Sequence, residues 1–274
     1  MIRVSIGEYA VRKLKIYSER AYKTKPIVKV FSVDFEAIIS ELIMKKILLN
    51  ILSRNSLYSL SIDWHFICLR LQNYLFLKTP KKIKTKASFL NIGCGAQGLD
   101  SAEWFNLDGW PAEGVDYECD LRRNLPFDEH RFWGIFSEHF FEHLDPADGR
   151  KFLEECFRIL RPGGIIRLSV PDGELYLKNY LENREWMLEL IKYRGWMLEP
   201  GKKYHTPMEL VNDVFRQNLQ HQYCYDFETI SLLLSEVGFK NISRVGFSIG
   251  SCKQLQIDRE ERQMDSLYVE ATKH

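Results

Sequence analysis

The stretch that decides the fold class is Ser88-Phe89-Leu90-Asn91-Ile92-Gly93-Cys94-Gly95. Its first five residues make a short, mostly apolar run of the kind that forms a buried strand. The glycines that follow allow a sharp turn and let a ligand come close to the backbone. We expect a helix after this turn, because a strand, a glycine turn and a helix in succession form the ligand-binding edge of a doubly wound α/β sheet. A tight turn with a purely structural role has the same sequence.

The residues after the glycine turn alternate between strand and helix patterns. Such alternation predicts a mostly parallel sheet with helices on both faces. One amphipathic helix is predicted over residues 147–160, where Arg161-Pro162-Gly163-Gly164 stops it, and another over residues 226–237, where Gly238 supplies a left-handed cap. The further strands are predicted at residues 104–107, 115–119, 132–136, 165–170, 240–247 and 266–271.

Two aspartates follow predicted strands at the same edge of the sheet. Asp108 follows the second strand, where a carboxylate can accept hydrogen bonds from both hydroxyls of a ribose. Asp120 follows the third strand, where it can accept from an exocyclic amino group such as adenine N6, and the backbone N–H of Leu121 can donate to a ring nitrogen. Each aspartate taken alone is also typical of a helix cap or a turn. Together with the glycine turn, the two predict a nucleoside site.

Charge divides the chain into two predicted parts, residues 1–86 and 87–274. The first part holds 17 Lys and Arg against 6 Asp and Glu, a net charge of +11, whereas the second holds 21 against 31, a net charge of −10. We predict a basic, mainly helical N-terminal extension, with two or three helices between Asp34 and Leu77, and then the α/β domain. Apolar residues in the extension predict packing on the α/β domain or on a second subunit of a homodimer. The basic linker, with Lys81, Lys82, Lys84 and Lys86, is predicted to face solvent or an anionic membrane surface.

Other features of the composition narrow the setting. The six cysteines form no CxxC pair and no zinc-finger pattern with His, which favours buried free thiols and a cytoplasmic protein. The basic N-terminal part is expected to allow peripheral contact at the inner membrane face. The chain has no run of 18 apolar residues, so no membrane span is expected. Lys and Arg are not clustered with the aromatic residues, so no nucleic-acid partner is expected.

A series of short motifs follows in a characteristic order and spacing. They are Leu90-Asn91-Ile92-Gly93-Cys94-Gly95, Phe105-Asn106-Leu107-Asp108, Asp120-Leu121, Leu125-Pro126-Phe127, Glu142-His143-Leu144, Leu160-Arg161-Pro162-Gly163-Gly164, Val170-Pro171-Asp172, Tyr225-Asp226, Val237-Gly238-Phe239 and Ser266-Leu267-Tyr268-Val269-Glu270-Ala271.

In this order the motifs resemble the class I S-adenosylmethionine-dependent methyltransferases, and more narrowly the bacterial type-11-like group that is often encoded near surface-polysaccharide genes. The resemblance spans residues 88–273 and leaves residues 1–86 outside it. It implies a Rossmann-like sheet, mostly parallel with an antiparallel last strand, and S-adenosyl-L-methionine as cofactor. It also implies methylation of a hydroxyl on a small-molecule or glycan acceptor; sugar hydroxyls, lipid-linked glycans and small metabolites all stay open.

The resemblance also assigns cofactor-binding residues. It implies that Gly93 and Gly95 lie under the methionine part of the cofactor, that Asp108 holds the ribose, and that Asp120 with Leu121 holds the adenine. The sequence departs from the pattern at two positions. Asn91 replaces a frequent carboxylate, which implies weaker or water-mediated recognition of the cofactor's amino group, and Trp133 replaces a frequent Asp, which implies a local packing change.

The catalytic residue is chosen among the polar residues after the fourth strand. A hydroxyl acceptor needs a base, and histidine has a pKa suited to that task. We predict His139 as the base, with His221, in a loop before a helix, and Glu138 as further candidates. Glu142 and His143 are interpreted as residues that cap and pack the next helix. The spacing of His139 and His143 would suit a metal, but the sequence shows no third ligand, so no metal site is predicted.

Two other functions stay open at this point. One is an NAD(P)-dependent sugar-modifying enzyme, because residues 93–98 also match the GxGxxG dinucleotide pattern, although no YxxxK motif follows. The other is a non-catalytic methyltransferase-like binding module. The aromatic residues between 176 and 204 are interpreted either as an acceptor-binding insertion or as a local helical core.

Overall fold

The computed structural model describes residues 52–77, 82–194 and 203–274. The predictions for residues 1–51 lie outside them, including the first part of the helical stretch expected between Asp34 and Leu77. The chain divides into two compact units, residues 1–80 and residues 81–274. Within the first unit, the described part is one continuous helix, α4 (Arg54–Leu77). None of the described helices is long and apolar enough to cross a membrane.

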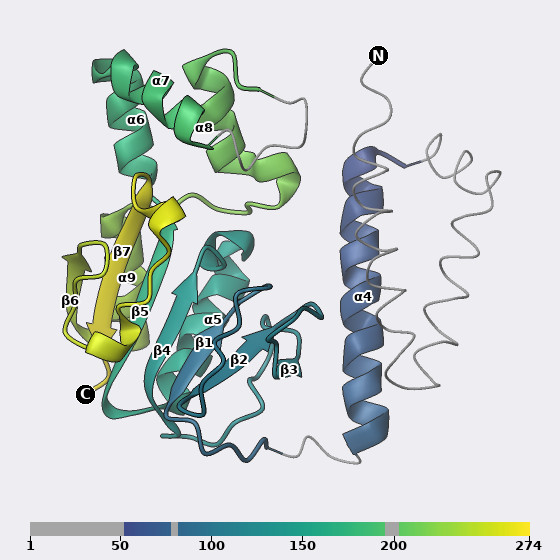
Figure 1. Cartoon of the computed structure of the whole chain (residues 1–274). Helices are drawn as coiled ribbons and strands as arrows, with labels where there is room; N and C mark the ends of the chain where they lie inside the picture. The colour runs from purple at the N-terminus through teal and green to yellow at the C-terminus, as the bar shows by residue number, and fades with distance from the viewer. Residues whose placement is uncertain (1–51, 78–81, 195–202) are drawn as a thin grey trace. The chain divides into compact units, whose positions relative to one another are not determined.

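The second unit is built on a seven-stranded sheet with the order β3-β2-β1-β4-β5-β7-β6 (Figure 1). Neighbouring strands from β3 to β5 are parallel, whereas β7 is antiparallel to both β5 and β6. This confirms the expected sheet with an antiparallel last strand in the sequence. The strands are β1 (Phe89–Ile92), β2 (Trp104–Asp108), β3 (Tyr117–Glu118), β4 (Phe132–Glu138), β5 (Leu160–Pro171), β6 (Lys240–Val245) and β7 (Ser266–Thr272).

Two helices pack together on one face of this sheet, and both begin at an aspartate cap. The Asp145 carboxylate accepts from two backbone N–H groups at the start of α5 (Pro146–Ile159). Asp226 caps α9 (Phe227–Val237) in the same way, and Gly238 ends that helix with a φ of 113°, a left-handed conformation that suits glycine. Both predicted helices are therefore confirmed.

The two faces of the sheet are buried to different extents, because successive strand residues point to opposite faces. Leu90 and Ile135 belong to the large apolar core that also contains residues of α5 and α9. Phe89 and Phe136 point the other way and form a small cluster with Leu255, from the segment between β6 and β7.

Three further helices form a separate lobe beyond the carboxyl end of β5 (Figure 1). They are α6 (Gly173–Glu182), α7 (Arg184–Tyr193) and α8 (Pro207–Arg216), and their shared core contains Tyr176, Met187, Leu190, Leu210, Val211 and Val214. Trp186, Tyr193 and Tyr204 pack against that core, which supports the interpretation of these aromatic residues as a local helical core. Trp196 lies outside the described residues.

The structure corrects two expectations near the glycine turn. No helix forms in the described segment 93–103, which consists of turns and bends. This segment lies against another loop: a Cβ on Gly98 would lie 2.1 Å from the carbonyl oxygen of Gly114, so the two loops touch through their main chains. The third strand contains only Tyr117 and Glu118, so Asp120 lies beyond its end.

The remaining sequence expectations have mixed outcomes. Each of the six cysteines, all within the described ranges, is a free thiol, and Cys94, Cys119 and Cys156 are buried. Trp133 is 49% exposed, and Arg161 Cζ lies 5.0 Å from the centre of its ring. The Trp that replaces the family's frequent Asp therefore changes the surface of the sheet and not its core.

Candidate functional site

The glycine turn leaves an open backbone surface at the carboxyl end of β1. Gly93 and Gly95 have φ values of 69° and 53°, which few other residues adopt. A Cβ on Gly93 would lie 2.3 Å from the Phe140 ring, whereas nothing lies within 4 Å of a Cβ position on Gly95. The turn is thus closed on the Phe140 side and open at Gly95, as a site that admits a ligand requires.

Asp108, at the end of β2, is directed toward the glycine turn. Its carboxylate accepts from the backbone N–H of Gly95 at 2.7 Å and from that of Trp110 at 2.8 Å. Asp108 is 8% exposed, so the carboxylate is nearly buried at the edge of the turn. Each carboxylate oxygen can accept a further hydrogen bond. The structure therefore places Asp108 at the turn, next to Gly95, which is the position that the prediction of a ribose-binding carboxylate requires.

The Asn91 side chain is hydrogen-bonded to the loop that follows the glycine turn. Its side-chain amide donates to the Gln97 carbonyl at 3.3 Å and to the Asn106 side-chain oxygen at 3.2 Å. Asn106 in turn binds both the N–H and the carbonyl of Leu99. The two asparagines therefore hold the loop after the glycine turn in place of the missing helix, and Asn91 shapes the site from beneath.

The adenine-side residues lie just beyond β3. Asp120 is 4% exposed and pairs with the Arg122 guanidinium at 2.9 Å, and Leu121 is buried in the main core. Sequence reasoning missed Glu118, which stands opposite Asp108 in the β2–β3 register. Burial and, next, the Asp108 charge raise the pKa of the Glu118 carboxyl. Its position at a strand end, like that of Asp108, was the signal that could have identified it.

The carboxyl end of β4 carries the predicted catalytic residues. Glu138 is the last residue of the strand, and its carboxylate accepts from the backbone N–H and the guanidinium of Arg259. His139 has a φ of 51°, an uncommon conformation for a non-glycine residue and one that is often found at functional sites. Its Nε2 lies 2.7 Å from Ser266 Oγ and its Nδ1 lies 3.3 Å from Glu142 Oε1. Glu138 is thus held in an ion pair, whereas His139 faces a carboxyl and a hydroxyl.

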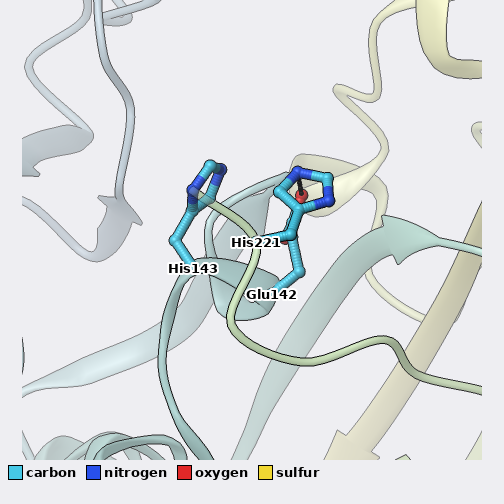
Figure 2. A group of neighbouring side chains, drawn as sticks. All are labelled: Glu142, His143 and His221. Atoms are coloured by element: carbon cyan, nitrogen blue, oxygen red, sulfur yellow. Dashed lines mark ion pairs between the residues drawn. The ribbon is translucent and has the colours of Figure 1, made fainter. Parts of the chain in front are cut away.

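Glu142 and His143 do not cap the next helix, α5, so the prediction that they have this role is wrong. Asp145 caps α5, and Glu142 and His143 belong to a short 3-10 turn, η1 (Phe141–His143). The Glu142 side chain turns inward, and its Oε1 lies 3.7 Å from Nε2 of His221 (Figure 2). His221 is 7% exposed, so it is not a surface residue of the loop before α9.

Backbone hydrogen bonds bring His221 to this turn from a distant part of the sequence. The Glu142 carbonyl accepts from the backbone N–H groups of Gln222 and Tyr223 at 2.8 and 3.2 Å. The Gly173 N–H donates to the Tyr225 carbonyl at 2.9 Å, which ties the same segment to the start of α6. The loop is therefore fixed on both sides.

Burial sets the protonation of this group. It raises the pKa of the Glu142 carboxyl to about 8. It lowers the pKa of His139 well below the usual value, with a further contribution from Arg262 and Arg194, and lowers that of His221 to about 4. Both imidazoles are consequently neutral near pH 7, with a lone pair on one ring nitrogen.

Comparisons with known proteins extend these observations. A family model described as a methyltransferase domain matches residues 64–244. No curated protein matches the sequence. A methyltransferase structure from Archaeoglobus fulgidus aligns with 14% identity over 81% of this chain and 100% of its own, with a TM-score of 0.38. A possible histamine N-methyltransferase from Thermotoga maritima aligns with 15% identity over 78% of this chain and 99% of its own, with a TM-score of 0.40.

Proposed function

We propose that this chain, which belongs to the methyltransferase-domain family and takes S-adenosylmethionine as its cofactor, methylates a hydroxyl group of a sugar, a glycan or another small molecule. The family match sets aside the two alternatives left open by the sequence, a nicotinamide-dependent enzyme and a non-catalytic module. The choice of a hydroxyl acceptor rests on the chemistry at the end of β4.

The observation that carries the proposal is the succession of polar groups along one edge of the sheet. Gly95 and Asp120 follow β1 and β3, Asp108 is the last residue of β2, and His139 follows β4, the strand next to β1. The first three fit a nucleoside, because an open backbone turn lies beside two carboxylates that can accept from hydroxyl and amino groups. His139 then lies on the other side of the turn, toward which the reacting end of the cofactor would point.

The reaction needs little from the protein beyond position and a proton acceptor. S-adenosylmethionine supplies a methyl group that is already activated on a sulfonium sulfur, so alignment of the acceptor provides much of the rate. The acceptor oxygen forms a bond to the methyl carbon as the carbon–sulfur bond breaks, and S-adenosylhomocysteine leaves. The hydroxyl proton passes to the neutral imidazole of His139.

His139 fits this task better than the other two candidates. The Glu138 carboxylate is already committed to Arg259, and His221 lies in the loop before α9, whereas His139 directly follows β4 at the edge of the sheet that carries Gly95 and Asp108. His139 keeps one nitrogen near the Ser266 hydroxyl and the other near Glu142, so a proton that it accepts can be shared with either neighbour.

A transfer assay tests the proposal. The purified protein is incubated with tritiated-methyl S-adenosylmethionine and fractionated cell-envelope extract, and label is followed into base-stable, ether-type products. The expected result is label in a glycan or small-molecule fraction, and much less label when Asp108→Ala replaces the wild type at a limiting cofactor concentration. Label found only in amine or thiol products, or in no fraction although the cofactor binds, would contradict the hydroxyl assignment.

A further inference from the structure

Three side chains gather close to the proposed base, His139. Glu142 and His143 come from η1, and His221 comes from the loop before α9. Figure 2 shows the three converging from these two segments. One ligand atom from each residue, a carboxylate oxygen and two ring nitrogens, lies within 4.8 Å of the other two. This separation suits three ligands of a single ion.

Both imidazoles are oriented for metal binding by backbone carbonyls. Nδ1 of His143 lies 3.1 Å from the Gln220 carbonyl oxygen, and Nδ1 of His221 is hydrogen-bonded to the Val214 carbonyl oxygen. A carbonyl oxygen only accepts, so Nδ1 carries the proton in both rings and the lone pair lies on Nε2. Metal-binding histidines are commonly fixed in the same way, through a hydrogen bond from the second ring nitrogen.

Glu142 is the independent sign of a missing ligand. Its carboxylate is buried, and neither oxygen has a hydrogen-bond partner among the described residues. A buried carboxylate without partners is costly to the fold, so such groups are usually paired or bound to a metal. The nearest groups are the two rings of His139 and His221, at 3.3 and 3.7 Å from Oε1.

The charges around the group do not exclude a cation. Arg194, Arg259 and Arg262 lie within electrostatic range. Arg259 is paired with Glu138, and Arg194 lies 3.2 Å from Asp265. The Glu138 and Asp265 carboxylates therefore offset two of the three guanidinium groups, and a carboxylate ligand at Glu142 would offset the third.

We propose that Glu142, His143 and His221 bind a divalent first-row transition-metal ion. Two imidazole nitrogens and one carboxylate oxygen are ligands that suit zinc, iron, cobalt and manganese, whereas magnesium and calcium take oxygen ligands. Three protein ligands leave at least one position open for water or for an acceptor oxygen. The spacing of His139 and His143 in the sequence includes only one of these two histidines. No spacing in the sequence indicates the other, His221, as a ligand, because it comes from a distant part of the chain.

The role of the ion rests on the proposed function, whereas its binding does not. An ion that held the acceptor hydroxyl oxygen would lower the pKa of that hydroxyl and fix its direction toward the methyl group. The proton would still pass to His139, whose Nδ1 lies 3.3 Å from the ligand Glu142. Binding can therefore be measured without any acceptor, and failure of methyl transfer would leave the metal result intact.

The test is a titration of the full-length protein, first stripped with EDTA, with Co²⁺ and then with Zn²⁺. Visible absorption of Co²⁺ reports the ligand type, because nitrogen and oxygen ligands give weak bands whereas thiolates add a strong near-ultraviolet band. The expected result is one Co²⁺ per chain without the thiolate band, displaced by one Zn²⁺. A thiolate band, or no stoichiometric binding, would overturn the proposal.

Variants locate the ion. Loss of an outer-sphere partner typically costs about 10- to 100-fold in affinity, so removal of a direct ligand by Glu142→Gln or His143→Ala should cost at least about 100-fold. His205→Ala is the matched control, because His205 is exposed and lies outside the group, and its affinity should equal that of the wild type. Glu142→Gln is isosteric and removes no hydrogen bond, which protects the test against misfolding. Unchanged affinity in both ligand variants would place the ion elsewhere and refute the assignment.

Discussion

Two groups of buried ionisable side chains within residues 81–274 differ in how their polar atoms are hydrogen-bonded. Arg167, in the middle of β5, is fully buried and donates to Asp258, to Glu270 and to the carbonyls of Gly246 and Ile249. Its two carboxylate partners accept further backbone N–H groups. Glu142, equally buried at the end of β4, accepts no hydrogen bond from the described residues.

The difference separates a structural role from a functional one. The Arg167 network joins β5 and β7 to the segment between β6 and β7, and every charge in it meets an opposite charge or a backbone dipole. Such a network costs stability when one member is removed. The Glu142 carboxyl is buried without a hydrogen-bond partner among the described residues, and nearby His139 has an uncommon backbone conformation; this combination is expected where a ligand completes the site.

The largest effect is expected in the Arg167 network. Arg167→Met leaves Asp258 and Glu270 buried without their cation, and should lower the free energy of unfolding by about 3–5 kcal/mol. Urea denaturation followed by circular dichroism measures it. Arg150→Met is the control, because its ion pair with Glu236 is on the surface and should contribute at most about 1 kcal/mol. Equal losses in the two variants would remove the distinction between the networks.

The next effect concerns turnover. His139→Ala should reduce methyl transfer about 100-fold, because a general base typically contributes that much or more. Affinity for S-adenosylhomocysteine, measured by calorimetry, should stay close to the wild-type value, since His139 lies across the turn from Asp108. Full activity in both His139→Ala and His221→Ala would mean that positioning alone, or Glu138, accounts for the rate.

A smaller effect is expected on cofactor affinity. Asp108→Ala removes hydrogen bonds from a charged acceptor, each worth about 1.5–3 kcal/mol, so affinity for S-adenosylhomocysteine should fall about tenfold or more. Asp108→Asn keeps one acceptor oxygen, so its affinity for S-adenosylhomocysteine should lie between those of Asp108→Ala and the wild type. Asp100→Ala, an exposed carboxylate in the same loop, serves as control and should bind normally. An affinity for Asp108→Ala equal to that of the control would refute the ribose assignment.

The smallest effect is expected for Glu142→Gln in metal-free buffer. The amide replaces a carboxylate that makes no hydrogen bond in the described chain, so the free energy of unfolding should change by less than about 1 kcal/mol. The same denaturation experiment as for Arg167→Met gives the value. If Glu142→Gln lowered the free energy of unfolding as much as Arg167→Met does, Glu142 would have a structural role like that of the Arg167 network.

Much of the fold follows from local patterns in the sequence. The apolar run before Gly93 forms β1, the stripe over residues 147–160 forms α5, and Gly238 ends α9 with a positive φ. These features depend on side-chain periodicity and backbone preference within a few residues. The helix expected after the glycine turn does not form; Gly98 there contacts Gly114 through the main chain, and no side-chain periodicity indicates such a contact.

The site was predictable where its residues follow strands and hidden where it needs distant partners. Asp108 and His139 were predicted from their places at the carboxyl ends of β2 and β4, and the structure has them there. His221 meets Glu142 only because Gln222 and Tyr223 pair with the Glu142 carbonyl, and Arg259 reaches Glu138 from the segment before β7. Such long-range contacts depend on the tertiary fold, and local sequence patterns do not specify them.

A structure of the protein crystallised with S-adenosylhomocysteine is the most direct test of the account. Its central claim is that one edge of the sheet binds the nucleoside and aims the methyl group at His139. The account predicts ribose hydroxyls within hydrogen-bond distance of Asp108, adenine beside Asp120 and Leu121, and the sulfur on the side of the turn that faces His139 and Glu142. A nucleoside bound away from Asp108, or a sulfur directed away from β4, would contradict it.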